Sequence, residues 1–189
     1  MARLLSALLV ACLLTGGFSA ALASGIPSAP LCTVPVRVAL CPAGDLVFSA
    51  TMRDLINNPL ADVDTWLEFC AASGWVLASS GQPPAITFPQ PCLPTVITDF
   101  NGVAAFALKG GGTVSGGIRL LCGGALVRND LGLASPDQNG DLTVDARDMA
   151  ILVRKIFAPT LDPTGDLNLD GHVNAGDLAV VMRHLGHHS

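Results

Sequence analysis

Several residue types are scarce in this chain of 189 residues, and their scarcity narrows the classes of function. The chain has no Tyr and only two Trp, Trp66 and Trp75, which leaves few aromatic side chains for stacking against a sugar. It has no C-x-x-C pair, a common start of a zinc site, so no zinc site is expected. All four His lie at position 172 or later, so the preceding region has none for a Ser-His-Asp or Cys-His arrangement.

Acids that could form a glycosidase pair are also few before residue 135. Asp62 and Asp64 are the nearest to each other, but they follow a turn and are expected to face solvent. Because the region before residue 135 has no His and no convincing carboxylate pair, we expect no enzymatic activity.

The N-terminus predicts a secretory signal peptide over residues 1–23. One early cation precedes an apolar run from Leu4 to Phe18, and Ala21-Leu22-Ala23 provides small residues for cleavage. A membrane anchor would need about 20 apolar residues, and Gly16-Gly17 interrupts this run. A lipoprotein box at Leu9–Cys12 is the other alternative, although apolar sequence continues past it. No later run is long enough to span a bilayer, so we expect a secreted protein, with cell-surface association left open.

Charge is concentrated in the C-terminal third. From residue 135 onward eight Asp face four cations, which gives this part −4 of the net charge of −5. Such a charge argues against nucleic-acid binding, which needs a basic face. Two calcium ions would neutralise it.

The cysteines favour an oxidising environment. Cys12 leaves with the signal peptide, and the five others lie in the first part of the mature chain. In an exported chain such cysteines usually form disulfides. We expect Cys70–Cys92 and Cys32–Cys41, with Cys122 as a remaining thiol that is free or pairs between chains.

The pattern along the chain predicts a mainly β region and then a helical one. Residues 24–44 are rich in Pro and predict an extended lead-in with an edge strand at 34–39. Residues 45–134 carry about seven short alternating segments, which predict a sandwich of two sheets. After Ser135-Pro136, which we interpret as a linker, the period changes from 2 to 3.6 and predicts a second domain over 135–189. The strand segments are 46–53, 63–69, 75–78, 95–99, 103–108, 117–122 and 125–128.

Two phrases of the β region resemble a known family. One is Met52-Arg53-Asp54 with Asn58-Pro59-Leu60-Ala61-Asp62-Val63, and the other is Thr98-Asp99-Phe100-Asn101-Gly102-Val103-Ala104-Ala105-Phe106. They are similar to signatures of invasin/intimin-type bacterial immunoglobulin-like domains, over roughly residues 45–130. The resemblance implies an immunoglobulin-like sandwich in which these phrases form turns and strand starts and are not catalytic. Asn101-Gly102 is also a strong hairpin signal, and Gly102 is expected at positive φ.

The C-terminal third contains an internal repeat. Residues 137–157 align with 166–186 at eight identities in twenty-one positions. Calcium takes six to eight oxygen ligands, and an EF-hand loop supplies them from positions 1, 3, 5, 7, 9 and 12. The candidate ligands of the first loop are Asp137, Asn139, Asp141, the Thr143 carbonyl, Asp145 and Asp148; those of the second are Asp166, Asn168, Asp170, the His172 carbonyl, Asn174 and Asp177.

Each loop is followed by apolar residues at helical spacing, over 149–156 and 178–185. Val144 and Val173, at position 8, are expected to face inward and pair the two loops. A loop with only a following helix, present twice and with Asp at position 12, resembles a type I dockerin. The resemblance covers about residues 135–187 and implies calcium binding and docking onto a cohesin module.

Two departures from the dockerin pattern affect the expectations. Positions 10 and 11, often cohesin-contacting Ser-Thr, are Ala146-Arg147 and Ala175-Gly176, so docking carries over less well than calcium binding. Position 6 usually turns through positive φ, but it is Leu142 in the first loop and Gly171 in the second. We expect this backbone cost of about 1–2 kcal/mol to outweigh the extra carboxylate of the first loop, so the second loop should bind calcium first.

These features together predict a secreted, non-catalytic protein that tethers or adheres through a calcium-stabilised module. Its partner would be a cohesin-like protein, a glycan or a cell-surface component. One alternative is an accessory component of a polysaccharide-degrading complex. Another is a self-assembling extracellular subunit, in which the lead-in adds a strand to a neighbour or the odd cysteine crosslinks chains. His184, His187 and His188 have a spacing compatible with zinc, but a frayed tail is the expected state.

Overall fold

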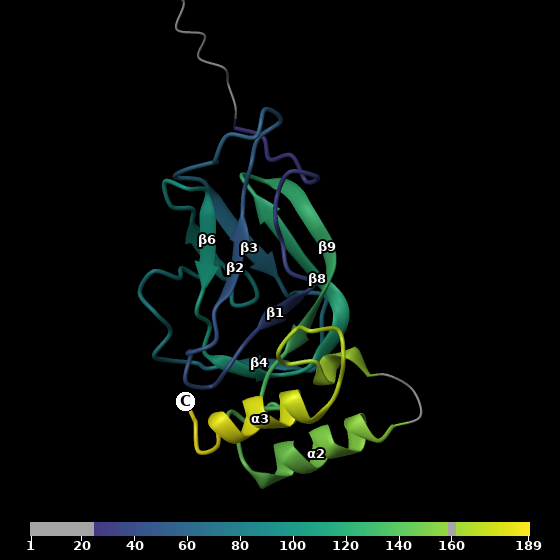
Figure 1. Cartoon of the computed structure of the whole chain (residues 1–189). Coiled ribbons are helices and arrows are strands. Elements are labelled where there is room, and N and C mark those ends of the chain that lie inside the picture. Colours follow the sequence, from purple (N-terminus) through teal and green to yellow (C-terminus); the bar gives the residue numbers. More distant parts are fainter. Residues whose placement is uncertain (1–24, 159–161) are drawn as a thin grey trace, which may run out of the picture.

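The structure is a computed structural model that describes residues 25–158 and 162–189 (Figure 1). The predicted signal peptide lies outside these residues. A mainly β region precedes two short helices, as the sequence predicts. The strands are β1 (Arg37–Ala39), β2 (Phe48–Thr51), β3 (Asp64–Glu68), β4 (Trp75–Leu77), β5 (Thr95–Ile97), β6 (Val103–Phe106), β7 (Gly110–Gly112), β8 (Val114–Cys122) and β9 (Ala125–Ala134).

The main sheet has five strands in the order β1-β9-β8-β3-β5. It is mixed, because β1 runs parallel to β9 while the other neighbours are antiparallel. Register shifts interrupt the pairing of β8 with β9, and such irregularities bend a strand and increase its twist. The sheet therefore curls into a half-barrel (Figure 1).

A ribbon of β2 and β6 encloses the core against this curled sheet. Phe48 pairs with Phe106 across the ribbon, and their ring centroids lie 5.9 Å apart. Both rings are buried in one cluster with Ile118, Leu120 and Leu131 of the main sheet. Alternating residues thus fill one core from two sides, as period-2 patterning requires.

The second ribbon, β4 with β7, contains a strand that the sequence did not predict. β7 is Gly110-Gly111-Gly112, which has low strand propensity and no side chains to form a pattern. Its backbone pairs with Trp75–Leu77 at the end of the β region near the helices (Figure 1).

The expected hairpin at Asn101-Gly102 is wrong. β5 pairs with β3 and β6 pairs with β2, so this turn carries the chain from the main sheet to the other ribbon. The Asp99 carboxylate fixes the turn by accepting hydrogen bonds from the backbone N–H groups of Asn101 (2.9 Å) and Val103 (2.8 Å). Gly102 has the expected positive φ, at 76°.

The lead-in is packed against the β region. Thr33 and Thr51 exchange two backbone hydrogen bonds of 2.9 Å, so the segment extends the edge of β2. Farther along, Arg37–Ala39 forms β1 beside β9. These contacts pair one edge of each segment within the chain, whereas β1 stands at the end of the main sheet and its other edge has no strand neighbour among the described residues.

Helices α2 (Ala146–Ile156) and α3 (Ala175–Arg183) are joined through the short 3-10 helix η1 (Pro163–Gly165). They form a second small core from Ala134, Val144, Leu152, Leu167 and Val181. Ser135 and Pro136 are buried at the junction of the two cores, so they form a packed connection. None of the helices in the described parts of the chain is long and apolar enough to cross a membrane.

The cysteines agree with the prediction in part. Cys70 and Cys92 form a disulfide, as expected, and a disulfide is typical of an oxidising compartment. The expected Cys32–Cys41 pair is wrong, because both residues are free thiols, as is Cys122. The Cys32 sulfur interacts with the backbone of Arg53, whereas Cys41 lies beside a histidine of the C-terminal tail.

Candidate functional site

The first candidate calcium loop is organised around Asp137. Its Oδ1 accepts backbone hydrogen bonds from Gly140 (2.8 Å) and Asp141 (3.3 Å), and its Oδ2 accepts one from Leu142 (2.9 Å). The Asp137 backbone carbonyl also accepts from the N–H of Gly112 at 2.7 Å. A Cβ added at Gly111 would collide with the Asp137 carboxylate, so the loop rests directly on the glycine strand β7.

Asp148, at position 12, closes the same loop and begins helix α2. Its Oδ1 accepts from the backbone N–H groups of Gln138 (2.8 Å) and Asn139 (3.2 Å), and its Oδ2 accepts from that of Asp145 at 2.8 Å. The Asp145 side chain in turn accepts from the Arg147 N–H. This capping box explains why the helix begins at Ala146, before the apolar stripe that starts at position 149.

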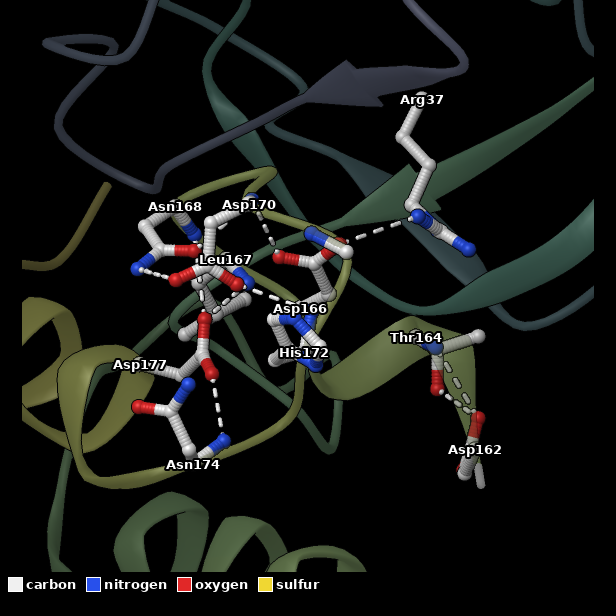
Figure 2. A network of polar contacts seen from close by, with 11 residues as sticks. Arg37, Asp162, Thr164, Asp166, Leu167, Asn168, Asp170, His172, Asn174 and Asp177 are labelled. Carbon is white, nitrogen blue, oxygen red and sulfur yellow. Dashed lines mark hydrogen bonds and ion pairs between the residues drawn. The ribbon is translucent and has the colours of Figure 1, made fainter.

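The second loop repeats this network in the C-terminal copy of the repeat (Figure 2). Asp166 accepts from the backbone N–H groups of Asp170 and Gly171, both at 3.1 Å. Asp177 accepts from Leu167 (2.7 Å), from Asn168 (3.1 Å) and from Asn174 (2.8 Å). The same capping box begins α3 at Ala175.

The middle positions of the loops also correspond. In the first loop the Asn139 amide donates to Asp141 at 3.0 Å, and in the second the Asn168 amide donates to Asp170 at 2.9 Å. The carboxylate at position 5 also accepts a hydrogen bond from the backbone N–H at position 7. In the first loop Asp141 accepts from Thr143, and in the second Asp170 accepts from His172. In each loop the side chains at positions 1, 3, 5 and 12 therefore bond to backbone N–H groups of the same loop, while the position 9 side chain serves as the helix N-cap.

Burial makes the negative charge of the first loop costly. Asp137 and Asp148 are both fully buried, and their environment raises the pKa of each carboxyl. For Asp137 the pKa rises to about 6, mainly through desolvation, which hydrogen bonds from Gly140 and Leu142 only partly offset. Nearby Asp148 and Asp141 add repulsion. A bound cation would remove this cost, because it would supply opposite charge at the centre of the cluster.

The second loop has a positively charged side chain, Arg37, beside it. The Arg37 guanidinium, on β1, lies 3.5 Å from Asp166 Oδ2, and Asp166 is 3% exposed (Figure 2). No ion pair of this kind reaches Asp137 among the described residues; the first loop has only a longer contact of 3.7 Å between Arg147 and Asp141. Arg37 therefore already compensates part of the charge that calcium would meet in the second loop.

Both loops place two residues at positive φ. In the first they are Gly140 at position 4 (74°) and Leu142 at position 6 (64°). In the second they are Leu169 at position 4 (60°) and Gly171 at position 6 (86°). The predicted cost at Leu142 thus has an equal counterpart at Leu169, and backbone strain no longer ranks the loops. This removes the basis for expecting the second loop to bind first.

The C-terminal tail is ordered against the first loop, so the expectation of a frayed tail is wrong. Val144 donates its N–H to the His187 carbonyl (2.9 Å) and accepts from the Gly186 N–H (2.9 Å), and His188 forms a β-bridge with Thr143. Val144 is buried and Val173 packs against the same small core, as expected, while the Val144 backbone pairs with the tail.

A second cluster of metal-binding side chains lies where the tail meets the β region. Cys41 and Asp45, which follow β1, face His184 and His187, which follow α3, and the four ligand atoms lie within 4.8 Å of one another. Burial and then the hydrogen bond to Asp45 raise the pKa of the Cys41 thiol to about 12. The sequence analysis missed this cluster because its halves lie near opposite ends of the described residues, with no local spacing motif to connect them.

The comparisons with known proteins add no family assignment. No family model, no curated protein and no solved structure matches the chain.

Proposed function

We propose that this protein is an exported, non-catalytic calcium-binding protein that tethers or adheres through its C-terminal module. The observation that carries the proposal is the repeated network: two separate loops hold Asp at positions 1, 5 and 12 and Asn at position 3 in the same hydrogen-bonded arrangement. Calcium loops of this spacing take their oxygen ligands from these positions, so the repetition favours two calcium sites over turns that merely carry Asp.

The loops keep lone pairs available for an ion. A carboxylate has about four acceptor sites, and Asp137 uses three of them for backbone N–H groups. Asp148 likewise uses three. The middle residues Asn139 and Asp141 are exposed and accept one or two hydrogen bonds each. Calcium would complete these sites, with the carbonyl of position 7 and water as further oxygen ligands.

The sheet topology supports an immunoglobulin-like assignment for the β region. In that fold strands C, F and G form one sheet, while B pairs with E in the other. Here β3, β8 and β9 are neighbours in the main sheet, and β2 pairs with β6. The disulfide and the predicted signal peptide are consistent with an extracellular location.

The positions that contact cohesin in dockerins are free for a partner. Ala146, Arg147, Ala175 and Gly176 are all exposed, at the start of the two helices. A cohesin-like module is therefore the partner we favour. The glycan-binding alternative has less support, because the Trp75 indole N–H donates to the Ala72 carbonyl and its ring packs on Phe69. For the self-assembling alternative, the lead-in pairs along one edge within its own chain, and β1 keeps an outer edge in the main sheet.

The test uses the chain from residue 24, with metal removed, titrated with calcium by isothermal calorimetry and followed by circular dichroism. We expect two bound ions and a gain of helical signal, with stability rising by RT ln(1 + [Ca]/Kd), about 4 kcal/mol at a thousandfold excess over Kd. Magnesium at the same concentration should have a much smaller effect, because it demands a stricter octahedral geometry.

The matched control is Asp99→Asn. Asp99 also fixes a turn by accepting two backbone N–H groups, but it lies in the β region. Asp99→Asn should bind two calcium ions, whereas Asp137→Asn combined with Asp166→Asn should bind none. Unchanged spectra with and without calcium, or equal binding by both variants, would refute the proposal.

A further inference from the structure

The geometry points to a zinc site formed by Cys41, Asp45, His184 and His187, which would join the β region to the end of α3. It differs from the calcium loops in its ligands and in its place, and it stands independently of the proposed calcium function.

Three of the six distances between ligand atoms in this cluster are close to those of a tetrahedral site, and all six are within 4.8 Å. Zinc binds nitrogen and oxygen at about 2.0–2.1 Å and sulfur at about 2.3 Å, so tetrahedral ligands lie about 3.3–3.6 Å apart. Asp45 Oδ2 lies 3.3 Å from His187 Nδ1 and 3.5 Å from His184 Nε2. Cys41 Sγ lies 3.7 Å from His187 Nδ1. Direct charge-assisted hydrogen bonds would be shorter, at about 2.7–2.9 Å.

The protein fixes the orientation of His184 for ligation. Its Nδ1 lies 2.7 Å from the Val180 backbone carbonyl, which can only accept, so Nδ1 carries a proton and donates. The neutral ring then presents the lone pair of Nε2 to Asp45 and the rest of the cluster. Histidines that bind zinc usually donate their other ring N–H to a carboxylate, a backbone carbonyl or water, which fixes the ring orientation.

The ligand chemistry selects zinc over calcium. One thiolate and two imidazoles suit a borderline-soft ion, whereas calcium takes oxygen ligands. With Cys41 and Asp45 ionised and both histidines neutral, Zn²⁺ brings the site to zero net charge. Neutrality matters because Cys41 is fully buried and His184 is 4% exposed.

The site would act as a clamp. Cys41 and Asp45 follow β1, whereas His184 and His187 stand at the end of α3. Val144 of the first calcium loop also donates to the His187 carbonyl. Zinc would therefore hold the tail in the position that supports this loop, and it would keep Cys41 from forming disulfides.

The experiment uses the chain from residue 24 with the Cys70–Cys92 disulfide intact, in excess calcium so that the calcium loops are saturated. Zinc is titrated against a chromophoric chelator, and cobalt(II) serves as a spectroscopic probe. We expect one zinc per chain and, with cobalt, a thiolate charge-transfer band. His184→Ala and Asp45→Asn should each weaken zinc binding by at least tenfold, and Cys41→Ser should abolish the cobalt–thiolate band.

Matched controls separate this site from the other candidates. His188→Ala removes an exposed neighbouring histidine, and Cys32→Ser removes a different free thiol; both should bind zinc as the parent chain does. Asp45 is exposed, so Asp45→Asn should fold even if Cys41→Ser does not. Absence of a stoichiometric site in the parent chain, or equal affinity of folded Asp45→Asn and His188→Ala, would overturn the proposal. A band that is lost in Cys32→Ser but retained in Cys41→Ser would do the same.

Discussion

The two candidate calcium loops have the same backbone network but different electrostatic surroundings. In the first, Asp137 and Asp148 are buried and the pKa of each is raised. In the second, Asp166 is 3.5 Å from Arg37. From the loop sequences alone, calcium affinity is ranked by the number of carboxylates and by the backbone cost of positive φ at Leu142. The structure shows that the neighbours outside the loop, β7 for one and Arg37 for the other, also contribute to the difference.

This comparison reverses the expected order of binding. Each loop has one leucine at positive φ, so strain is balanced. The first loop has one carboxylate more, and the second already has a cation beside its position 1. We therefore expect calcium to bind more tightly to the first loop, residues 137–148.

The largest effect is expected from removing the position 1 carboxylates one at a time. Asp137→Asn should abolish the tight site, lowering its affinity by about a hundredfold or more, because a buried ligand and its charge are lost together. Asp166→Asn should remove the weaker site and leave the tight one intact. Isothermal titration distinguishes these outcomes. If Asp166→Asn removes the tight site instead, carboxylate number and Arg37 do not determine the order.

The next effect is a pH dependence of the calcium-free protein. The folded pKa of Asp137 is about 6, above its ordinary value of 3.8, so the folded state binds more protons between these values. Without calcium, stability should rise as the pH falls from about 7 toward about 4, by several degrees in Tm. With saturating calcium the trend should reverse, because protons compete with the ion. Thermal melts of the parent chain and of Asp137→Asn measure the difference; an equal slope in both would contradict the assignment.

A smaller effect should follow from Arg37→Gln. Removing the guanidinium takes away a charge of the same sign as calcium, so the affinity of the second loop should rise about fivefold, equivalent to roughly 1 kcal/mol. The first loop should be unchanged. Arg128→Gln is the control, since Arg128 donates to the Val34 carbonyl in the β region. Weaker binding at the second loop in Arg37→Gln would show that Arg37 supports this site.

The smallest effect concerns the two leucines at positive φ. Leu142→Gly and Leu169→Gly should each relieve left-handed strain, but each also loses packing and adds chain entropy, which leaves a net gain of about 0.5 kcal/mol. Calcium affinity of each loop should rise by about twofold in its own variant. A gain confined to Leu142→Gly would restore the ranking by backbone strain.

The local features of this protein were predictable from its sequence. Alternating segments such as 63–69 became strands, and Asp148 at position 12 accepts from the backbone of Gln138 in its own loop, because neighbours in sequence determine both. The sequence also predicted the backbone cost of positive φ at Leu142, but not the equal cost at Leu169. Gly140 at position 4 of the first loop was a signal that this position takes positive φ, and Leu169 occupies it in the second.

Features that depend on distant residues were not predictable. Strand β7 has no side-chain pattern, and the turn at Asn101-Gly102 gives no sign that it leads to another sheet. The cluster of Cys41 with His187 joins two positions separated by 146 in the sequence. Arg37 and Asp166 are separated by 129, so the cation of the second loop could not be assigned from the loop sequence.

The contact between Asp137 and strand β7 limits how freely the C-terminal part can be transferred between proteins. Any side chain at Gly111 would collide with the Asp137 carboxylate, and the Gly112 N–H holds the Asp137 carbonyl at 2.7 Å. A fragment starting at residue 135 would lose the contact with β7, and Asp137 would become exposed to water. The calcium loops are therefore expected to keep these contacts in another protein only when the glycine strand β7 is transferred with them.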